Sequence, residues 1–477
     1  MRHGREILAS LLALAVFGLA CATNPVTGKK EISFVSEAQE IAAGKASVAE
    51  TEAEYGFYDD AGWNTRVNTI GQKLASVSHR PDLEWQFHVI DDASVNAFAA
   101  PGGYIYITRG ILAHLNSEAQ LAGVLGHEIG HVTARHYASA ASQQTLANLG
   151  LGVASILSPT VAKFGDIASS GLGLFFLKYS RDHENQADQL GVDYSVKGGW
   201  DAREMAGTYQ TLSRISAASG STLPTYLSTH PDPAAREATV RALAAKAVGA
   251  RTDLKIARDA YIRSLDGLVF GEDPQQGYLE GDHFYHPGLE FQMDFPSGWK
   301  HQNSRQTVMA GSGQTAVMQL TIVGTNNLSP AQYVSQLQAA GKITGAQGQS
   351  ETIGGWPAWV GRVSVQDSQG NTGTLALAMI ERAQGSAFQI LGQGNDGAVI
   401  ASARSMRPLT DQGRLAAAPA RIRIMSAPSS GQFDTVMSGL GAQGIPMSQL
   451  AILNGVDPSD RVTKGQPLKT VVPARLR

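Results

Sequence analysis

Three features are scarce in this 477-residue sequence. It contains one cysteine, Cys21, which excludes an intrachain disulfide and a zinc site built on thiolates. It has no cluster of basic residues and its formal net charge is −3, so nucleic acid is not an expected partner. It also has no apolar run of the roughly 20 residues that a membrane-spanning helix needs. The length is enough for about three domains.

Residues 1–21 have the pattern of an export signal, with two arginines before an apolar run that ends in small residues. A single cysteine in this place resembles the lipobox of bacterial lipoproteins, in which the cysteine is lipidated. Gly18 replaces the usual leucine three residues before Cys21, and ordinary signal-peptidase cleavage also fits. We expect a periplasmic protein that is anchored to the outer membrane by a lipid on Cys21.

The sequence HEIGH at residues 127–131 carries the most specific chemistry. On a helix, His127 and His131 share one face and can bind one metal ion together. Glu128 is placed to take a proton from a water molecule at that ion. Zinc fits, because it lowers the pKa of its water to about 7 and keeps a position open for substrate. A glycine before each histidine leaves room for substrate or a second helix. Chance produces such a motif in about one or two of a hundred such chains, so a third ligand is needed.

The segment SRDHENQAD at residues 180–188 supplies a candidate third ligand. Glu184 and Asp188 are four residues apart and would share one helical face. Glu184 would complete a site of two histidines and one glutamate, and Asp188 would accept the N–H of a ligating imidazole. A solvated acidic helix face is the alternative, which the upstream motif disfavours. His183 would point about 100° away from Glu184 and is not expected to bind.

A third segment, LSTHPDP at residues 227–233, resembles a loop that leads into a helix. Pro231 keeps His230 in an extended or turn conformation. If His230 or Arg236 faced the zinc, it could stabilise the oxyanion that forms when water attacks a peptide carbonyl. An exposed histidine at the beginning of a helix is an equal alternative.

Two β-rich runs, 89–90 and 104–107, flank the segment NAFAAPGG at residues 96–103. They predict strands joined through a turn that contains glycine and proline. An edge strand beside the zinc could bind an extended peptide through main-chain hydrogen bonds, which predicts broad specificity for unfolded segments. A hairpin that only fills the core is the alternative.

These motifs resemble the family of HExxH zinc metallopeptidases that includes the CAAX prenyl endopeptidase, HtpX and BepA. The sequences NPVTG at 24–28 and VSEAQE at 35–40 resemble the N-terminal signature of its soluble, secreted bacterial branch. Residues 96–103 resemble its substrate-strand motif. The resemblance covers residues 24–265 and implies a gluzincin-like fold.

The resemblance also implies a role for each side chain of the predicted site. One zinc ion per chain would be bound by His127, His131 and Glu184. Glu128 would be the general base, and His230 would stabilise the transition state. The remaining residues would support these groups or contact the substrate: Asp188, Arg236, Asn96 and Ala97.

Between the two ligand motifs, residues 146–157 and 167–177 are apolar and rich in glycine. In the membrane-embedded relatives this part of the chain is transmembrane. Here polar residues and a proline divide it into pieces of about a dozen residues, which are too short to span a bilayer. We expect two helices over the active site that form a movable lid, with contact to a membrane surface as the alternative.

The remaining chain divides into three parts. Residues 275–407 alternate between apolar and polar, which predicts a separate α+β domain, loosely similar to PsbP and without a metal or acid–base cluster. Residues 408–420 are rich in alanine, proline and glycine and predict a linker. Residues 421–472 resemble a LysM module, which implies peptidoglycan binding. The first turn, residues 429–432, lacks the usual Gly-Asp-Thr, so a purely structural module is the alternative.

The sequence therefore predicts an α+β protein. A mainly helical gluzincin-like metallopeptidase domain with a small edge sheet, residues 24–268, precedes the α+β domain and the LysM-like module. We expect a zinc metalloendopeptidase that cleaves misfolded or extended envelope proteins. An aminopeptidase is disfavoured, because no acidic amine-recognition motif accompanies HEIGH. A chaperone or a peptidoglycan-tethering lipoprotein with little proteolysis is the alternative from another class.

Overall fold

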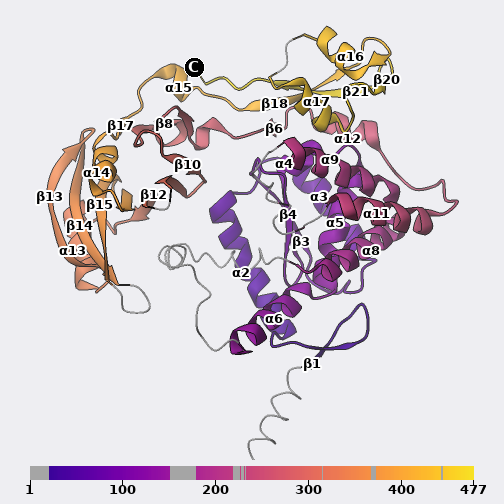
Figure 1. Ribbon diagram of the computed structural model, residues 1–477, viewed down its shortest axis with the longest axis horizontal. Helices are drawn as coiled ribbons and strands as arrows, with labels where there is room; N and C mark the ends of the chain where they lie inside the picture. The colour runs from indigo at the N-terminus through magenta and orange to yellow at the C-terminus, as the bar shows by residue number, and fades with distance from the viewer. Residues whose placement is uncertain are drawn as a thin grey trace, which may run out of the picture.

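The computed structural model of the chain describes these residues: 21–150, 179–218, 226, 230, 233–313, 315–366, 372–441 and 444–476. Residues 1–20 of the predicted export signal lie outside them, as do the predicted lid segments apart from residues 146–150 at the end of one helix. Among the described residues, no helix is long and apolar enough to cross a membrane. Figure 1 shows a mainly helical domain, a sheet-rich domain beside it, and a C-terminal module that returns to the helical domain.

The helical domain contains a small mixed sheet in the order β3–β5–β4. Its strands are β3 (Gln86–Ile90), β4 (Ala97–Ala100) and β5 (Tyr104–Thr108). Strand β3 runs parallel to β5, whereas β4 runs antiparallel to it. The two predicted β-rich runs therefore do not pair as a hairpin with each other. The hairpin is formed by β4 and β5, and β4 is left at the edge of the sheet.

Helices cover both faces of this sheet. In chain order the helices of this domain are α2 (Glu37–Tyr55), α3 (Ala61–Ala75), α4 (Arg109–His114), α5 (Glu118–Thr133), α6 (His136–Gly150), α8 (Arg181–Gly198), α9 (Met205–Ala218), α11 (Pro233–Val248) and α12 (Arg258–Ser264). One sheet face, with Ala99 and Ile105, shares a core with α3 and α5. The other face, with Phe98 and Tyr106, packs against α2. A short ribbon of β1 (Cys21–Thr23) and β2 (Lys30–Ile32) precedes them.

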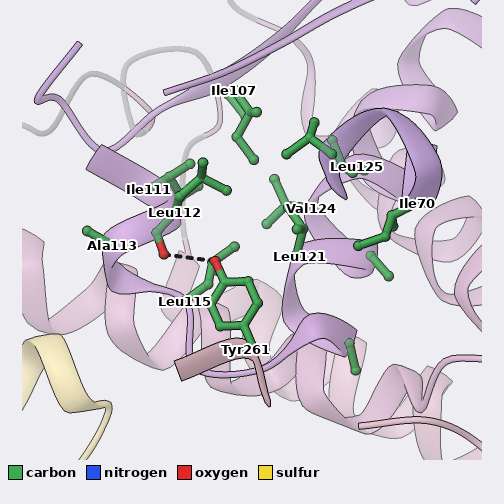
Figure 2. Packing of buried hydrophobic residues seen from close by; sticks show 14 of the residues in the cluster. Ile70, Ile107, Ile111, Leu112, Ala113, Leu115, Leu121, Val124, Leu125 and Tyr261 are labelled. Atoms are coloured by element: carbon green, nitrogen blue, oxygen red, sulfur yellow. Dashed lines mark hydrogen bonds between the residues drawn. The ribbon is translucent and has the colours of Figure 1, made fainter. Parts of the chain in front are cut away.

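Figure 2 shows the first of these cores, where aliphatic side chains of α4 and α5 surround Tyr261 of α12. The buried Tyr261 hydroxyl donates a hydrogen bond to the carbonyl oxygen of Leu112 at 2.8 Å. A buried hydroxyl needs such a partner, because leaving it unpaired away from water costs free energy. This bond therefore ties α12 to α4 within an otherwise apolar core.

The second domain contains a seven-stranded antiparallel sheet in the order β10–β11–β12–β16–β15–β14–β13. Its elements are β10 (Lys300–Asn303), β11 (Thr307–Ser312), β12 (Ala316–Gly324), α13 (Pro330–Ala339), β13 (Thr344–Ile353), β14 (Trp356–Gln366), β15 (Thr372–Ala383), β16 (Ser386–Gln393) and α14 (Asp396–Arg404). Helices α13 and α14 pack on its strands and two separate apolar cores form, one with Val334 of α13 and one with Val399 of α14. A smaller sheet in the order β17–β9–β8–β7 completes the domain. Its strands are β7 (Tyr278–Glu280), β8 (His283–His286), β9 (Phe291–Asp294) and β17 (Arg407–Pro408).

The C-terminal module joins the helical domain directly. Its elements are β18 (Ala420–Ser426), β19 (Gly431–Gln432), α16 (Phe433–Gly439), α17 (Met447–Asn454), β20 (Arg461–Val462) and β21 (Pro467–Val472). Strand β18 pairs with β21 on one side and with β6 (Val269–Phe270), which follows the helical domain, on the other. Side chains of the module, such as Phe433, belong to the same apolar core as α5. The segment predicted as a linker contains the short helix α15 (Gln412–Leu415).

A buried lysine strengthens this junction. The ammonium group of Lys469 on β21 donates hydrogen bonds to the carbonyl oxygens of Ala113 and Leu115, at 2.7 and 2.6 Å, and to that of Leu453 at 2.8 Å. The first two carbonyls lie at the end of α4, where a helix leaves carbonyl groups without helical partners and favours a cation. The module is therefore a packed part of the molecule and not an appendage on a free tether.

Candidate metal centre

Helices α5 and α8 approach each other closely and place the predicted ligands opposite one another. Ser117 begins α5 by accepting a hydrogen bond from the N–H of Gln120, and Ser180 begins α8 in the same way. A Cβ atom added to Gly126 would lie 3.1 Å from the carbonyl oxygen of Gly191 on α8, so side chains larger than hydrogen would force the helices apart. The small residues therefore set the separation at which side chains of both helices can share one ion.

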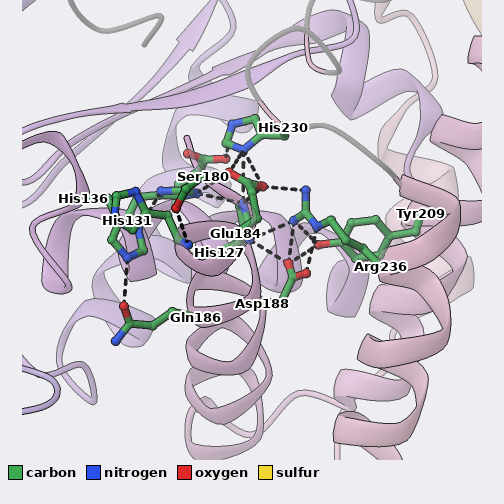
Figure 3. A network of polar contacts seen from close by, with 12 residues as sticks. His127, His131, His136, Ser180, Glu184, Gln186, Asp188, Tyr209, His230 and Arg236 are labelled. Carbon is green, nitrogen blue, oxygen red and sulfur yellow. Dashed lines mark hydrogen bonds and ion pairs between the residues drawn. The ribbon is translucent and has the colours of Figure 1, made fainter. Parts of the chain in front are cut away.

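Four side chains converge in this place, and each offers one donor atom within 4.8 Å of the others: His127, His131, Glu184 and His230. The two Nε2 atoms of His127 and His131 are 3.1 Å apart. The carboxylate of Glu184 lies 3.7 Å from the first and 3.5 Å from the second. Figure 3 shows these rings and the carboxylate pointing toward one another. All four residues are buried.

Hydrogen bonds behind the two rings fix which nitrogen atoms face the centre. The Nδ1 of His127 lies 3.0 Å from an oxygen of Asp188, so it carries the proton and its Nε2 presents a lone pair. The Nδ1 of His131 lies 2.9 Å from the Nδ1 of His136, whose Nε2 donates to the amide oxygen of Gln186 at 3.0 Å. The Nδ1 of His131 is therefore the donor, and its Nε2 also presents a lone pair.

Two lone pairs that face each other at 3.1 Å repel unless a cation lies between them. The donor set of imidazole nitrogen and carboxylate oxygen suits zinc, which binds such groups at about 2.0–2.2 Å in four-coordinate sites. The residues therefore fit one zinc ion, with both histidines held in the tautomer that ligation requires.

The third segment brings His230 into the same cluster. Its Nδ1 lies 3.0 Å from an oxygen of Glu184 and 3.4 Å from the Nε2 of His127. Its Nε2 lies 3.8 Å from an oxygen of Glu128, and its ring stacks on Tyr226. His230 thus stands where a fourth ligand would stand in this conformation.

Arg236 on α11 joins the two acidic residues of α8 into one network, also visible in Figure 3. Its Nη1 lies 2.6 Å from Glu184, and its Nε and Nη2 contact the two oxygens of Asp188 at 2.8 and 2.6 Å. Burial alone would raise the pKa of both carboxyls. His230 and Arg236 outweigh burial at Glu184 and lower its pKa to about 2, and hydrogen bonds from Arg236 and His127 hold the pKa of Asp188 well below its usual range. Both groups are therefore anionic at neutral pH.

Residues 63–244 match the model of Peptidase family M48. We call the helical domain that contains this segment the M48 domain, after the family model that the segment matches. The predicted family resemblance is thereby confirmed for this part of the chain. The match begins in α3 and ends in α11, so it contains all four side chains that could hold a metal ion.

Two curated relatives match part of this chain, and the match covers only part of each relative. The mitochondrial metalloendopeptidase OMA1 of Arabidopsis thaliana is 35% identical over 159 residues, which cover 33% of this chain and 31% of that protein. The beta-barrel assembly-enhancing protease of Escherichia coli is 27% identical over 254 residues, which cover 50% of this chain and 52% of that protein. The alignments thus span about a third of the first relative and about half of the second.

Among solved structures, a cyanobacterial PsbP from Synechocystis aligns with 26% of this chain and 91% of its own length. The TM-score is 0.21 and the identity is 9%, values at which the likeness carries no conclusion.

The predicted general base of the M48 domain, Glu128, is buried beside the ligands. Its Oε1 has no hydrogen-bond partner among the described residues. Burial raises the pKa of Glu128, although His230 and His127 oppose the shift. A buried carboxyl group with a raised pKa and an oxygen that accepts no hydrogen bond has the properties of a proton acceptor at a reaction centre. Its catalytic role stays a prediction.

Asn96 and Ala97 lie at the start of the edge strand β4, and both are buried. The side-chain oxygen of Asn96 has no hydrogen-bond partner among the described residues. Ala97 belongs to the core shared with α5. Their predicted contact with substrate stays a prediction. His183, which was not expected to bind metal, stacks on His136 at 4.4 Å between ring centroids and is not in the metal-binding group.

Three residues of the M48 domain that hold the ligands in place were not predicted. His136 and Gln186 set the tautomer of His131, and the hydroxyl of Tyr209 contacts Asp188 at 2.5 Å and Arg236 at 2.9 Å. Gln186 is two residues from Glu184, and His136 follows HEIGH by five residues, a spacing that does not place it on the same helical face. Tyr209 comes from α9 and has no signal in the sequence.

Proposed function

We propose that this protein is a zinc-dependent metalloendopeptidase. The observation that carries the proposal is a three-residue donor set, His127, His131 and Glu184, beside the buried carboxylate of Glu128. The Oε1 of that carboxylate accepts no hydrogen bond from the described residues. Two histidines and one glutamate leave a fourth position for chemistry, which is the pattern of catalytic and not of structural zinc sites. The match to Peptidase family M48 supports the same reaction class.

Each side chain then has one task in peptide hydrolysis. A zinc ion held by the three ligands would polarise the substrate carbonyl and would make water acidic enough to be deprotonated near neutral pH. Glu128 accepts that proton and returns it to the leaving amine. Asp188 and Arg236 hold His127 and Glu184 in position.

We propose that His230 stabilises the oxyanion. In the described conformation its Nδ1 lies beside Glu184 and His127, so it must move from the fourth position before water and substrate can enter. The neighbouring residues 227–229 and 231–232 lie outside the described part of the chain. His230 would therefore block the site in the described conformation and stabilise the oxyanion after it has moved.

We further propose misfolded or extended proteins of the bacterial envelope as substrates. Strand β4 lies at an edge of its sheet, where an extended chain of almost any sequence can add through main-chain hydrogen bonds. The name of the Escherichia coli relative, beta-barrel assembly-enhancing protease, and the export-signal pattern of residues 1–21 support a periplasmic location. Lipidation of Cys21 would anchor the protein to the outer membrane.

For the C-terminal module we propose a LysM-like fold with peptidoglycan as its partner. The order β18, α16, α17, β21 and the antiparallel pairing of the two strands support the proposal. Retention of the full-length protein on purified peptidoglycan tests it. Elution with the unbound fraction would leave the module a purely structural role.

The peptidase proposal is tested by incubating zinc-loaded protein with β-casein and with a urea-denatured outer-membrane protein. We expect fragments from the wild type and none from Glu128→Gln. Glu52→Gln, which neutralises an exposed carboxyl on α2, is the matched control and should cleave like the wild type. If zinc-loaded wild type does not cleave, or if Glu128→Gln cleaves equally well, the enzyme proposal is wrong and a chaperone or tether remains.

A further inference from the structure

A polar cavity lies at the seam between the M48 domain and the sheet-rich domain. Its volume is about 280 Å³, and both domains line it. The M48 domain contributes the end of α2 with Glu54, the β3–β4 connection with Asp91 and Asp92, and Asn96 before β4. The segment that follows β6 contributes Glu272, and the second domain contributes Gln276 and residues 302–305. No residue proposed above as a metal ligand lines it.

The cavity carries more negative than positive charge. Of its four carboxylates, Asp91 is neutralised, because it accepts hydrogen bonds from Arg109 at 2.6 Å and from Gln276 at 2.9 Å. Asp92 accepts only the backbone N–H of Ser94, at 2.5 Å. The carboxylates of Glu54 and Glu272 form no hydrogen bond or ion pair with any residue that the structure describes.

One cation also borders the cavity. Arg305 lines it, is exposed and lies over the backbone of Gly56, with no ion pair to a carboxylate of the described residues. Three carboxylates therefore face the cavity without a bound counter-charge, against one arginine at its rim. Burial and the neighbouring Asp92 both raise the pKa of Glu54 and of Glu272, which is the effect that a bound cation would relieve.

An unsatisfied acceptor points to a ligand independently of the charge. Asn96 is 3% exposed and lines the cavity, and its Oδ1 has no hydrogen-bond partner among the described residues. A buried polar atom without a partner costs free energy, which a donor group of a ligand would recover. An ammonium or guanidinium group offers several such donors together with positive charge.

The cavity also lies on the side of β4 toward which side chains of a peptide added to that strand would point. Asn96 and Phe98 line it and are two residues apart, so they point to the same face of β4, the face that packs on α2. Ala97 and Ala99 point to the opposite face, into the core shared with α5. Every second side chain of a peptide paired with the free edge of β4 would therefore point toward the cavity side.

We propose that this cavity is a subsite for a basic side chain, lysine or arginine, of a peptide bound along β4. The proposal rests on the peptidase function proposed above and names a preference within it. A bare metal ion is disfavoured as the occupant, because no group of three acidic or histidine donors outside the zinc cluster comes together among the described residues. The second domain also borders the subsite, because Gln302 and Asn303 line the cavity.

The test measures binding without cleavage, in zinc-loaded full-length protein that carries Glu128→Gln. The probes are fluorescein-labelled ten-residue alanine-rich peptides in which one lysine, or one norleucine of similar length, is moved through successive positions. We expect lysine at one position, and at positions two residues away more weakly, to bind about three- to tenfold more tightly than norleucine in fluorescence anisotropy. The difference should shrink as sodium chloride rises from 0.05 to about 0.5 M.

Two substitutions in the same background test the cavity itself. Asp92→Asn keeps an oxygen that can accept from Ser94, and Glu272→Gln changes a side chain of the segment that follows β6. Each should remove most of the lysine preference and leave norleucine binding unchanged. Asp82→Asn, an exposed carboxyl outside the cavity, should keep the preference.

Equal binding of lysine and norleucine peptides at every position, a preference that survives both cavity substitutions, or no binding of either peptide would each overturn the subsite. Cleavage of casein by the wild type would still stand in those cases. Failure of the subsite and failure of the peptidase proposal are therefore distinguishable.

Discussion

The M48 domain and the sheet-rich domain bury different kinds of side chain. In the sheet-rich domain the buried residues are almost all apolar, and between 275 and 407 the buried polar ones in the described part are Thr325 and Ser402. In the M48 domain the buried set includes ionised or ionisable groups, among them His127, Glu128, His131, His136, Glu184, Asp188, His230 and Arg236. Burying such groups costs free energy unless they are paired, so their concentration in one domain marks where the chemistry lies.

The largest expected effect comes from removing Arg236, the buried cation that contacts both Glu184 and Asp188. Arg236→Met would leave Glu184 and Asp188 buried without their shared counter-charge. We expect metal-free protein to lose about 3–5 kcal/mol of unfolding free energy in urea. Arg241→Met on the same helix breaks only an exposed pair with Glu237 and should cost less than about 1 kcal/mol. Equal effects of the two substitutions would mean that the buried network does not act as a unit.

A cavity created in the core of the sheet-rich domain should lower the unfolding free energy as much as Arg236→Met does. It should leave zinc binding unchanged. Phe388 is 1% exposed and lies within the core of the large sheet. Phe388→Ala should lower the unfolding free energy by about 3–5 kcal/mol, with zinc stoichiometry unchanged in the folded protein. Its cross-strand partner Ile322 is 42% exposed, so Ile322→Ala should cost far less. Loss of zinc from folded Phe388→Ala would break the comparison, because it would couple the two domains.

Lys469, in the C-terminal module, is a buried ionisable residue that lies outside the metal site. It contacts three carbonyl oxygens, and burial lowers its pKa well below the ordinary value. Lys469→Met would leave these carbonyls without a donor and should cost about 1.5–3 kcal/mol. Faster amide hydrogen exchange in β21 would report the loosened module. The exposed Lys464→Met is the control, and unchanged exchange in both variants would refute the role of the lysine at the junction.

The last prediction concerns how folding stability changes with pH. The Nδ1 of His114 donates to the carbonyl oxygen of Gly110 at 2.8 Å, and burial lowers the pKa of His114 to about 4. Between pH 6.5 and 4 the unfolded chain binds this proton and the folded protein does not. Folding stability should therefore fall with decreasing pH by about 1.4 kcal/mol per pH unit at most from this residue. His114→Gln should reduce the slope of stability against pH in that window; an unchanged slope would mean that His114 titrates normally.

The sequence was most informative where chemistry and helical periodicity coincide. Four-residue spacings placed His127 with His131 and Glu184 with Asp188, and the glycine before each histidine foretold the close approach of α8. Residues that act across elements could not be found in this way. His136 reaches His131 from the next helix, and Tyr209 reaches Asp188 from α9, so only the packed fold reveals them.

Domain contacts were beyond sequence reasoning for the same physical reason. Composition indicated a linker at 408–420, but pairing of β18 with β6 and the burial of Phe433 depend on contacts more than 100 residues apart. Alternating apolar residues did predict strands after residue 275, because a sheet with one buried face imposes a period of two. The order of those seven strands left no trace in the pattern.

The central claim is that His127, His131 and Glu184 bind one zinc ion. Zinc-edge X-ray absorption of the full-length protein, together with metal analysis, tests it most directly. We predict one zinc per chain with nitrogen and oxygen ligands at about 2.0–2.2 Å, and a loss of zinc in both His131→Ala and Glu184→Ala. A sulfur shell, or full zinc occupancy with an unchanged ligand shell in both variants, would contradict the account.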